Sequence, residues 1–582
     1  MLPRVLRLLV TSSVLALALS STAARAADTV TRTLRVDPDR APGVGPVEIP
    51  VDQRIARAEV IAIECAADGA RAPAGTIVRV GYQGFQRGRH VAWLELPDGC
   101  GMPVEHARHA LQLQVVLSLE PCGAVPVPRE RVVPDWEDGG GPPRARAAEA
   151  RARTDAASVA PAPRPEAPAP FRPTQVPSLL GSPVAYLIVT SDPLVPAFQS
   201  LADWKTASGV PAAVRTLSFI REQYPAAVDD PERVRLFLRD AYDRWGTRWV
   251  LLGGDTEILP PRIAHVSFLD DALVPTDLYY SCLDGNWNAD GDSAFAEAFA
   301  GPTAPGDDAD LLPEVWVGRA PVVTPADAEL FVRKTLTYET APVADYMESV
   351  LFFAQVITPD PWSPGQPVQL DGAQIVELDQ MPILDGTPNI HVARLYQNHT
   401  DPRWRPGSVH ETRAGVFDSL EAGYNVAMHV GHGYREVMSC GDGNLDNTDM
   451  HSLANGDRLM NFYAIDCTSN AIDFASIGEA LMRAPAGGAV TNIGSTRLDY
   501  PKYSRGFQKE YFRLLFADSV TAVGEAQARQ KLPFVGGSQF DGFSRLSQLE
   551  LLLLGDPELR IFTARPRELA VIAPATITAG EG

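Results

Sequence analysis

Residues 425–433 read Asn-Val-Ala-Met-His-Val-Gly-His-Gly, an apolar run that ends in a histidine between two glycines. A short apolar run bounded by glycine is typical of a strand that is buried on both faces of a parallel sheet. The glycines on either side of His432 allow a sharp backbone turn and leave the peptide N–H groups accessible. Ligands bind at the carboxyl ends of parallel strands, so this stretch predicts a crevice that contains His432.

A second apolar run ends at another reactive residue type. Phe462-Tyr463-Ala464-Ile465 leads through Asp466 to Cys467, which lies 35 residues after His432. If the two strands are neighbours, Cys467 and His432 meet in one crevice. A thiol needs a nearby base to attack a carbonyl at neutral pH, and His432 fits that role and the later role of acid. The N–H groups of Gly433 and Cys467 are the expected oxyanion donors.

Strands and helices alternate on both sides of this region. The predicted strands are 184–190, 211–214, 249–252, 315–317, 350–356, 390–396, 425–430, 462–466 and 489–493, and the predicted helices are 195–207, 232–245, 326–338, 411–422 and 477–484. This alternation predicts an α/β fold with a parallel sheet and helices on both faces. Two successive sets predict two side-by-side parallel-sheet subdomains, residues 179–345 and a catalytic subdomain 346–564. Residues 565–582 are expected to be the start of a further β segment or a tail.

The N-terminal part is organised differently. Residues 1–26 combine early arginines, a short apolar run and a small-x-small cleavage site, which predicts a signal peptide and a secreted mature protein. Short strand-like runs separated by Gly, Pro and Asp predict an all-β unit, a β-sandwich, over residues 27–137. Residues 138–178, rich in Pro, Ala and Arg, predict a linker. It is either a passive connector or the place where a pro-segment is cut off.

The charge of the chain argues against two classes of partner. The formal net charge is −21, from 51 Lys+Arg and 72 Asp+Glu. Nucleic acids and anionic membranes attract an excess of Lys and Arg, so we expect neither as the main partner. No stretch has the roughly 20 apolar residues of a transmembrane segment. The six cysteines are sparse for a disulfide scaffold of this size, and their connectivity stays open.

Several stretches, in the same order, resemble the gingipain family, in the larger group that includes caspases and legumains. The matching stretches are Pro275-Thr276-Asp277-Leu278-Tyr279-Tyr280, Val317-Gly318-Arg319, Gly431-His432-Gly433, Ile465-Asp466-Cys467, Gly478-Glu479-Ala480-Leu481-Met482-Arg483, Ile493-Gly494-Ser495-Thr496 and Leu554-Gly555-Asp556-Pro557. The resemblance covers roughly residues 183–563.

The resemblance implies a caspase-like catalytic unit of two subdomains, preceded by a prodomain, and a cysteine endopeptidase that is made as a zymogen. His432 matches the catalytic histidine of the family and Cys467 its nucleophile, which implies a Cys-His dyad and a thioester acyl-enzyme intermediate. The implied partners are protein or peptide substrates and the chain's own prodomain. Gingipains also use an upstream acidic residue to orient the histidine. Asp371, Glu377 and Asp379 lie in the corresponding region, and no motif assigns the role to one of them.

One polar loop resembles a calcium-binding segment. Side-chain oxygens alternate along it, at Asp284, Asn286, Asn288, Asp290 and Asp292. Such alternation around glycine turns is typical of calcium loops, although the glycines do not stand where an EF-hand has its glycine. Structural calcium sites in gingipains support Ca²⁺ here, with these five residues as ligands. The alternative is a loop of Asx turns without a metal.

Other functions stay open at this point. His429, His432, Cys440 and Cys467 have the chemistry of a zinc site, although residues three apart on a strand point to opposite faces. A catalytically inactive binding or adhesion protein on the same fold is the second alternative. Cys440 is a rival nucleophile, but no predicted strand aims it at the crevice. We expect no cofactor for catalysis.

Overall fold

The computed structural model describes residues 28–36, 43–48, 53–65, 76–86, 89–95, 111–121, 184–266, 272–298, 306–539 and 541–567. The predicted signal peptide, the predicted linker and most of the predicted tail lie outside these residues. No helix within them is long and apolar enough to cross a membrane.

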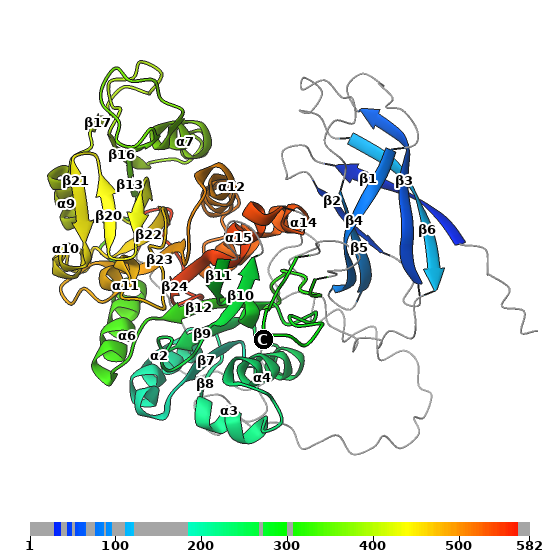
Figure 1. Cartoon of the computed structure of the whole chain (residues 1–582). Coiled ribbons are helices and arrows are strands. Elements are labelled where there is room, and N and C mark those ends of the chain that lie inside the picture. Colours follow the sequence, from blue (N-terminus) through cyan, green and yellow to red (C-terminus); the bar gives the residue numbers. More distant parts are fainter. Residues whose placement is uncertain are drawn as a thin grey trace, which may run out of the picture.

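Antiparallel strands make up the N-terminal sheet, drawn in blue in Figure 1. Their order is β1-β6-β3-β4-β5-β2, with bounds Asp28–Val36 (β1), Gly43–Glu48 (β2), Gln53–Cys65 (β3), Thr76–Gln86 (β4), Arg89–Glu95 (β5) and Leu111–Pro121 (β6). In β6, Val115, Leu117 and Leu119 are buried and alternate with partly exposed residues, as in a strand with one covered face. The strands of one antiparallel sheet agree with the predicted all-β unit, and the sandwich arrangement stays a prediction.

A single large sheet runs through the rest of the chain (Figure 1). Its order is β17-β16-β13-β18-β22-β23-β24-β12-β9-β7-β8. The bounds are Tyr186–Thr190 (β7), Ala212–Thr216 (β8), Trp249–Gly253 (β9), Trp316–Ala320 (β12), Ser349–Ala354 (β13), His391–Tyr396 (β16), Val409–His410 (β17), Val426–Val430 (β18), Met460–Ile465 (β22), Ala489–Ser495 (β23) and Leu551–Gly555 (β24). Short strands outside it are Arg262–Val266 (β10), Ala272–Thr276 (β11), Val356–Thr358 (β14), Leu370–Asp371 (β15), Gly433–Tyr434 (β19), Val437–Cys440 (β20) and Gly443–Asp446 (β21).

The two predicted subdomains share this sheet, which differs from the expectation of two separate parallel sheets. Every neighbouring pair is parallel except β23 and β24, which are antiparallel. The strands of the first half therefore run in the opposite direction to those of the second half. The sequence analysis did not predict β24, which pairs with β12 on one side and β23 on the other. A strand from the end of the chain thus joins the halves.

Helices cover both faces of the sheet. The bounds are Val195–Ala207 (α2), Leu217–Gln223 (α3), Asp230–Trp245 (α4), Leu278–Ser281 (α5), Pro325–Thr340 (α6), Gly372–Ile375 (α7), Met381–Leu384 (α8), Arg413–Ala422 (α9), Asn447–Ser452 (α10), Ile477–Met482 (α11), Pro501–Phe512 (α12), Val523–Arg529 (α13), Val535–Ser538 (α14) and Gly542–Glu550 (α15). Apolar residues of α2, α6, α9 and α11 form one core cluster with the sheet, and those of α4, α7, α12, α13 and α15 belong to two further clusters.

Local sequence signals set the helix ends. The Asp229 carboxylate accepts the N–H of Glu232 at the start of α4, and Gly246 ends α4 with a φ of 69°, in the left-handed region. At α6, Thr324 and Asp327 form a capping box. These caps satisfy backbone groups that a helix end leaves open, which is why the predicted and observed bounds lie close together.

Two of the family-like stretches in the first half form a buried ion pair. Nε and Nη2 of Arg319 donate to the Asp277 carboxylate at 2.8 and 2.6 Å, and Nη1 donates to the carbonyls of Gly254 and Leu259. Arg319 is fully buried. A buried guanidinium with this many acceptors fixes the loops around it, because removing one partner leaves an uncompensated charge.

The stretch after β24 is held in a similar way. Nζ of the fully buried Lys205 on α2 lies 2.7 Å from Asp556 and 2.8 Å from Glu558. The hydroxyl of Tyr186 donates to the other oxygen of Asp556 at 2.8 Å. The stretch that ends β24 is thereby anchored to the first half of the sheet.

Candidate active site

The strands that carry His432 and Cys467 are direct neighbours. β18 pairs with β22 in parallel register, with Val430 opposite Ile465, and the N–H of Gly431 donates to the carbonyl of Ile465 at 3.0 Å. Both candidate residues stand two positions beyond this last pair. The structure therefore brings them to the same edge of the sheet, as the sequence predicts.

Residues that follow β13 hold His432. Its backbone N–H donates to Oε1 of Gln355 at 3.0 Å, and ring Nε2 lies 3.0 Å from the carbonyl oxygen of Ile357. A carbonyl oxygen only accepts, so the neutral tautomer that makes this contact has its proton on Nε2 and none on Nδ1. The His432 side chain is 37% exposed. Nδ1 is thus the nitrogen that can take a proton from a thiol.

The thiol of Cys467 lies against the loop after β23. It makes a weak contact with the carbonyl oxygen of Asp499, at 3.7 Å. Burial, and after it the charge of Asp499, raises the pKa of the Cys467 thiol to about 12. No described hydrogen bond joins this thiol to His432. Catalytic hydrogen bonds are often long in a free enzyme and tighten only with substrate.

Two buried carboxyl groups accompany the thiol. Burial raises the pKa of Asp499 to about 7, with a further contribution from Asp466. Burial and the charge of Asp499 hold the pKa of Glu550 well above its usual range. Neither carboxyl oxygen of Glu550 has a hydrogen-bond partner among the described residues. Burial therefore favours the neutral form of both carboxyl groups, and with a pKa of about 7 Asp499 changes charge near neutral pH.

A second histidine, His429, connects the ends of the two strands. His429 and Asp466 are both buried, and Nδ1 of His429 lies 3.2 Å from Oδ2 of Asp466. The His429 ring stacks on Phe353, with ring centroids 4.9 Å apart. A Cβ at Gly433 would lie 2.7 Å from Oδ2 of Asp466, so only glycine fits there. The contact between His429 and Asp466 links the residue before Cys467 to β18, the strand that leads to His432.

Glycines of two other family-like stretches allow close packing under the Cys467 loop. A Cβ at Gly478 would lie 2.0 Å from Oδ1 of Asn470, and one at Gly494 would lie 2.6 Å from Oγ of Ser469. Asn470 receives a hydrogen bond from Asn492 at 2.9 Å. The sequence matched these glycines to the family without explaining them. Their role is to admit the polar side chains that shape this loop.

The three candidate orienting acids are all engaged away from His432. Asp371 accepts the N–H of Ala373 and the amide of Asn398, Glu377 accepts from Arg394 and Tyr396, and Asp379 accepts from Arg505. The carboxylate nearest to the His432 ring in the described contacts is that of Asp360, with Oδ2 3.9 Å from Nε2. Sequence reasoning missed both Asp360 and Gln355, because only the pairing of β13 with β18 brings them to His432.

The four residues of the zinc alternative do not assemble. Among the described residues, the groups of His, Cys, Asp and Glu that could hold a metal ion include none of His429, His432, Cys440 and Cys467. Cys440 is 1% exposed, and burial raises the pKa of its thiol well above the usual range. Because Cys440 is buried, a substrate carbonyl cannot reach its thiol, whereas Cys467 is partly exposed. Cys282, Cys440 and Cys467 are the free cysteines among the described side chains.

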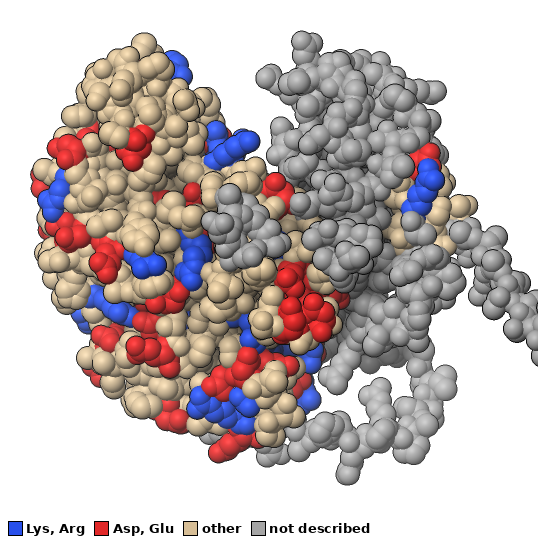
Figure 2. Space-filling model, viewed as in Figure 1, with Lys and Arg blue, Asp and Glu red and all other residues tan. Residues whose placement is uncertain are grey.

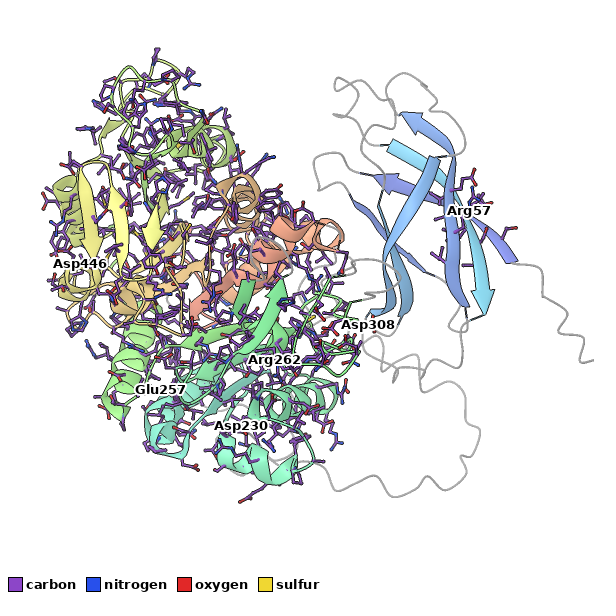
Figure 3. The ribbon with its side chains drawn as sticks, viewed as in Figure 1. Arg57, Asp230, Glu257, Arg262, Asp308 and Asp446 are labelled. Atoms are coloured by element: carbon purple, nitrogen blue, oxygen red, sulfur yellow. The ribbon has the colours of Figure 1, made fainter. Side chains whose placement is uncertain are left out.

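The structure divides the predicted calcium ligands between two clusters. Asp290 and Asp292 lie with Glu297, and Asp284 lies with the buried Asp310 and Glu314. Within each cluster, ligand oxygens lie within 4.8 Å of one another. Figure 2 shows acidic side chains gathered on this loop, where Figure 3 labels Asp308.

The two asparagines of the predicted set take part in turns. The N–H of Asn288 donates to Oδ1 of Asn286 at 3.1 Å, and the amide of Asn288 donates to the carbonyl of Asp292 at 2.8 Å. Such bonds are typical of Asx turns.

A mixed sheet with a cysteine and a histidine beyond neighbouring strand ends supplies the two groups that a cysteine peptidase of α/β fold needs. The profile of Peptidase family C25 matches residues 180–562, and the chain belongs to this family, the gingipain family. No curated protein matches the sequence.

Two solved structures have a similar fold. A complex of the pro- and mature domains of RgpB from Porphyromonas gingivalis is 20% identical, with a TM-score of 0.53 over 68% of this chain and 84% of that chain. The Arg-specific cysteine proteinase gingipain R (RgpB) is 20% identical, with a TM-score of 0.52 over 70% of this chain and 85% of that chain.

Proposed function

We propose that the chain is a secreted cysteine endopeptidase that uses Cys467 as nucleophile and His432 as general base. The observation that carries the proposal is the pairing of β18 with β22, which puts both residues two positions beyond the same strand pair. Family membership supports hydrolysis of peptide bonds. The free lone pair on Nδ1 of His432 supports the proton transfer.

In the proposed mechanism, Nδ1 of His432 takes the thiol proton as Sγ of Cys467 attacks the substrate carbonyl carbon. The N–H groups of Cys467 and Gly433 hold the oxyanion. When the C–N bond breaks, His432 returns the proton to the leaving amine, and a thioester remains on Cys467. Water, deprotonated by His432, then hydrolyses the thioester and releases the acid. Asp360 and Gln355 keep the ring and backbone of His432 in place.

Hydrolysis of fluorescent casein by the purified protein tests this proposal. We expect Cys467→Ala and His432→Ala to lose at least a thousandfold of the rate, because the dyad acts as a unit. Cys440→Ala is the matched control and should retain the rate. If Cys467→Ala retains activity, the assignment of Cys467 as the nucleophile is wrong. If the unaltered protein cleaves nothing after linker cleavage, the inactive binding protein becomes the better interpretation.

We propose further that residues 27–137 act as a prodomain and that cleavage in 138–178 releases the active enzyme. The N-terminal sheet lies next to the catalytic unit, with β2 and β5 against α14 (Figure 1). One of the similar structures is a complex of pro- and mature domains. Limited trypsin digestion should cut the arginine-rich linker and raise the casein rate. An equal rate before and after cleavage would contradict a zymogen.

A structural Ca²⁺ ion is proposed for the loop that carries Asp290, Asp292 and Glu297. Hard carboxylate oxygens within 4.8 Å of one another suit this ion. It would hold the loop and take no part in the chemistry. Millimolar Ca²⁺ should raise the Tm, and Asp290→Asn should reduce that rise. An identical rise in the Asp290→Asn variant would refute this location.

A further inference from the structure

Exposed apolar side chains gather at the edge of the sheet that carries the catalytic pair. Of the large apolar side chains that are exposed among the described residues, Tyr434, Phe474, Leu498 and Leu273 lie in or next to loops that meet there. Tyr434 is 55% exposed, Phe474 41% and Leu498 52%. Tyr434 stands two residues after His432, and Phe474 stands in the loop that begins with Cys467. Large apolar side chains gathered in this way mark binding surfaces more often than isolated ones do.

A stacked arginine fixes the two aromatic rings. Cζ of Arg435 lies 3.5 Å from the ring centroid of Phe474 and 5.0 Å from that of Tyr434. No described carboxylate lies within ion-pair distance of Arg435. The guanidinium therefore supports the rings, and a rigid aromatic surface loses little entropy when it binds a ligand.

The backbone around this stack is strained and tied to the nucleophile loop. Arg435 has a φ of 44° and Thr468 a φ of 58°, values that L-residues rarely adopt. The N–H of Arg435 donates to Oγ1 of Thr468 at 2.7 Å, and the N–H of Ile477 donates to the carbonyl of Arg435 at 2.7 Å. Strain of this kind persists where the surrounding structure enforces it, often at functional sites.

The same loop reaches Leu498 and Leu273 through Arg497. The carbonyl of Arg497 accepts the N–H of Thr468 at 2.8 Å. The Arg497 guanidinium donates to the carboxylate of Asp473 at 2.8 and 2.9 Å and to the carbonyl of Leu273 at 2.7 Å. Asp473 directly precedes Phe474, so the apolar side chains belong to one connected rim.

We infer that Tyr434, Phe474 and Leu498 form a specificity subsite that binds an apolar side chain of the peptide substrate close to the scissile bond. The inference rests on the proposed peptidase function. A peptide at Cys467 is the occupant because the rim is continuous with the loops of both catalytic residues. An aliphatic or aromatic side chain would cover the exposed faces of the rings, whereas a polar one would lose its hydration there.

The test measures kcat/KM of the full-length protein, after linker cleavage, on fluorogenic peptides that carry Leu, Phe, Ser, Gln or Glu at each position around the cleaved bond. We expect one position to favour Leu or Phe over Ser by roughly tenfold or more. Phe474→Ser should bring this ratio close to one, and Phe474→Leu should restore most of it. Val409→Ser changes an exposed apolar residue on β17, at the outer edge of the sheet; it is the control and should leave the ratio unchanged.

Three results would overturn the inference in distinguishable ways. An apolar preference that survives in Phe474→Ser refutes the subsite but leaves the peptidase function intact. A preference for Glu that disappears in Arg435→Met assigns the rim to an acidic side chain instead. Cleavage by neither the unaltered protein nor any variant, with no difference from Cys467→Ala, removes the peptidase function and the subsite together. Iodoacetamide labelling of Cys467 at an unchanged rate verifies the fold of each variant that keeps this cysteine.

Discussion

Replacing Asp499 by asparagine should make the Cys467 thiol more reactive above pH 7 and leave it unchanged below pH 6. The Asp499 charge is the second cause, after burial, of the raised pKa of Cys467. The pKa of Asp499 is itself raised to about 7, so its charge is present only above that pH. Asparagine has the same shape and keeps the backbone carbonyl that the thiol contacts.

The size of the effect follows from two opposing terms. A like charge close to an acid raises its pKa by roughly one unit or more, and one unit corresponds to about tenfold in the thiolate fraction. A thiolate of lower pKa is intrinsically less nucleophilic, by about threefold per unit at a Brønsted coefficient of about 0.5. The net expectation is an alkylation rate about threefold higher for each unit by which the pKa falls.

The assay is iodoacetamide alkylation of Cys467 from pH 5 to 9, followed by mass spectrometry. The ratio of the Asp499→Asn rate to the unaltered rate should be one at pH 5.5, rise with a midpoint near pH 7 and reach about three at pH 8.5. Asp518→Asn removes an exposed carboxylate of another part of the chain and should give a ratio of one throughout. A threefold ratio at pH 5.5 as well as at pH 8.5, or no rise at all, would refute the electrostatic reasoning.

Three further predictions concern stability and the loop that begins with Cys467. The pKa of Asp499 is higher in the folded state than the ordinary value of 3.8, so the folded state binds this proton more tightly and the contribution of Asp499 to stability falls as pH rises from about 4 through 7. Asp499→Asn should therefore raise the Tm at pH 8 but not at pH 4. An equal rise of the Tm at both pH values would contradict the sign of this effect. Asp277→Asn leaves the buried Arg319 without its counter-charge and should lower the free energy of unfolding by about 3–5 kcal/mol in urea titrations, whereas a change under 1 kcal/mol would mean that the pair is not buried. Gly478→Ala places a Cβ 2.0 Å from Oδ1 of Asn470 and should reduce casein hydrolysis at least tenfold; Gly386→Ala, where the nearest atom is 3.4 Å away, is the control, and equal activity of the two variants would show that the loop absorbs the methyl group.

The sequence predicted local features of the fold well. The helix predicted at 195–207 matches α2, and the predicted strands around His432 and Cys467 match β18 and β22 within one or two residues. Apolar periodicity and helix caps act over a few residues, so the sequence contains these signals directly. The pairing of strands that are distant in the sequence has no such local signal. For that reason the single sheet and the place of β24 were missed.

The same distinction applies to the site. Strand-ending motifs were enough to select His432 and Cys467 as candidates. The contacts of His432 with Gln355, Ile357 and Asp360 span about 75 residues, and no local spacing encodes them. The spacing of the calcium loop could not show which acidic residues lie together, because Asp284 lies with Asp310 and Glu314, which come much later in the chain.

The position of β24 also makes the sheet depend on a segment that is synthesised late. Residues 551–555 fill the centre of the sheet, between β12 and β23, although they come more than 80 residues after Cys467. Until this strand is synthesised and inserted, the two half-sheets expose unpaired edges, and the loop under Cys467 lacks the Leu552 carbonyl to which Asn470 donates. Contacts this distant in sequence form late in folding. The nascent or unfolded chain therefore has neither a continuous sheet nor the assembled loop that begins with Cys467.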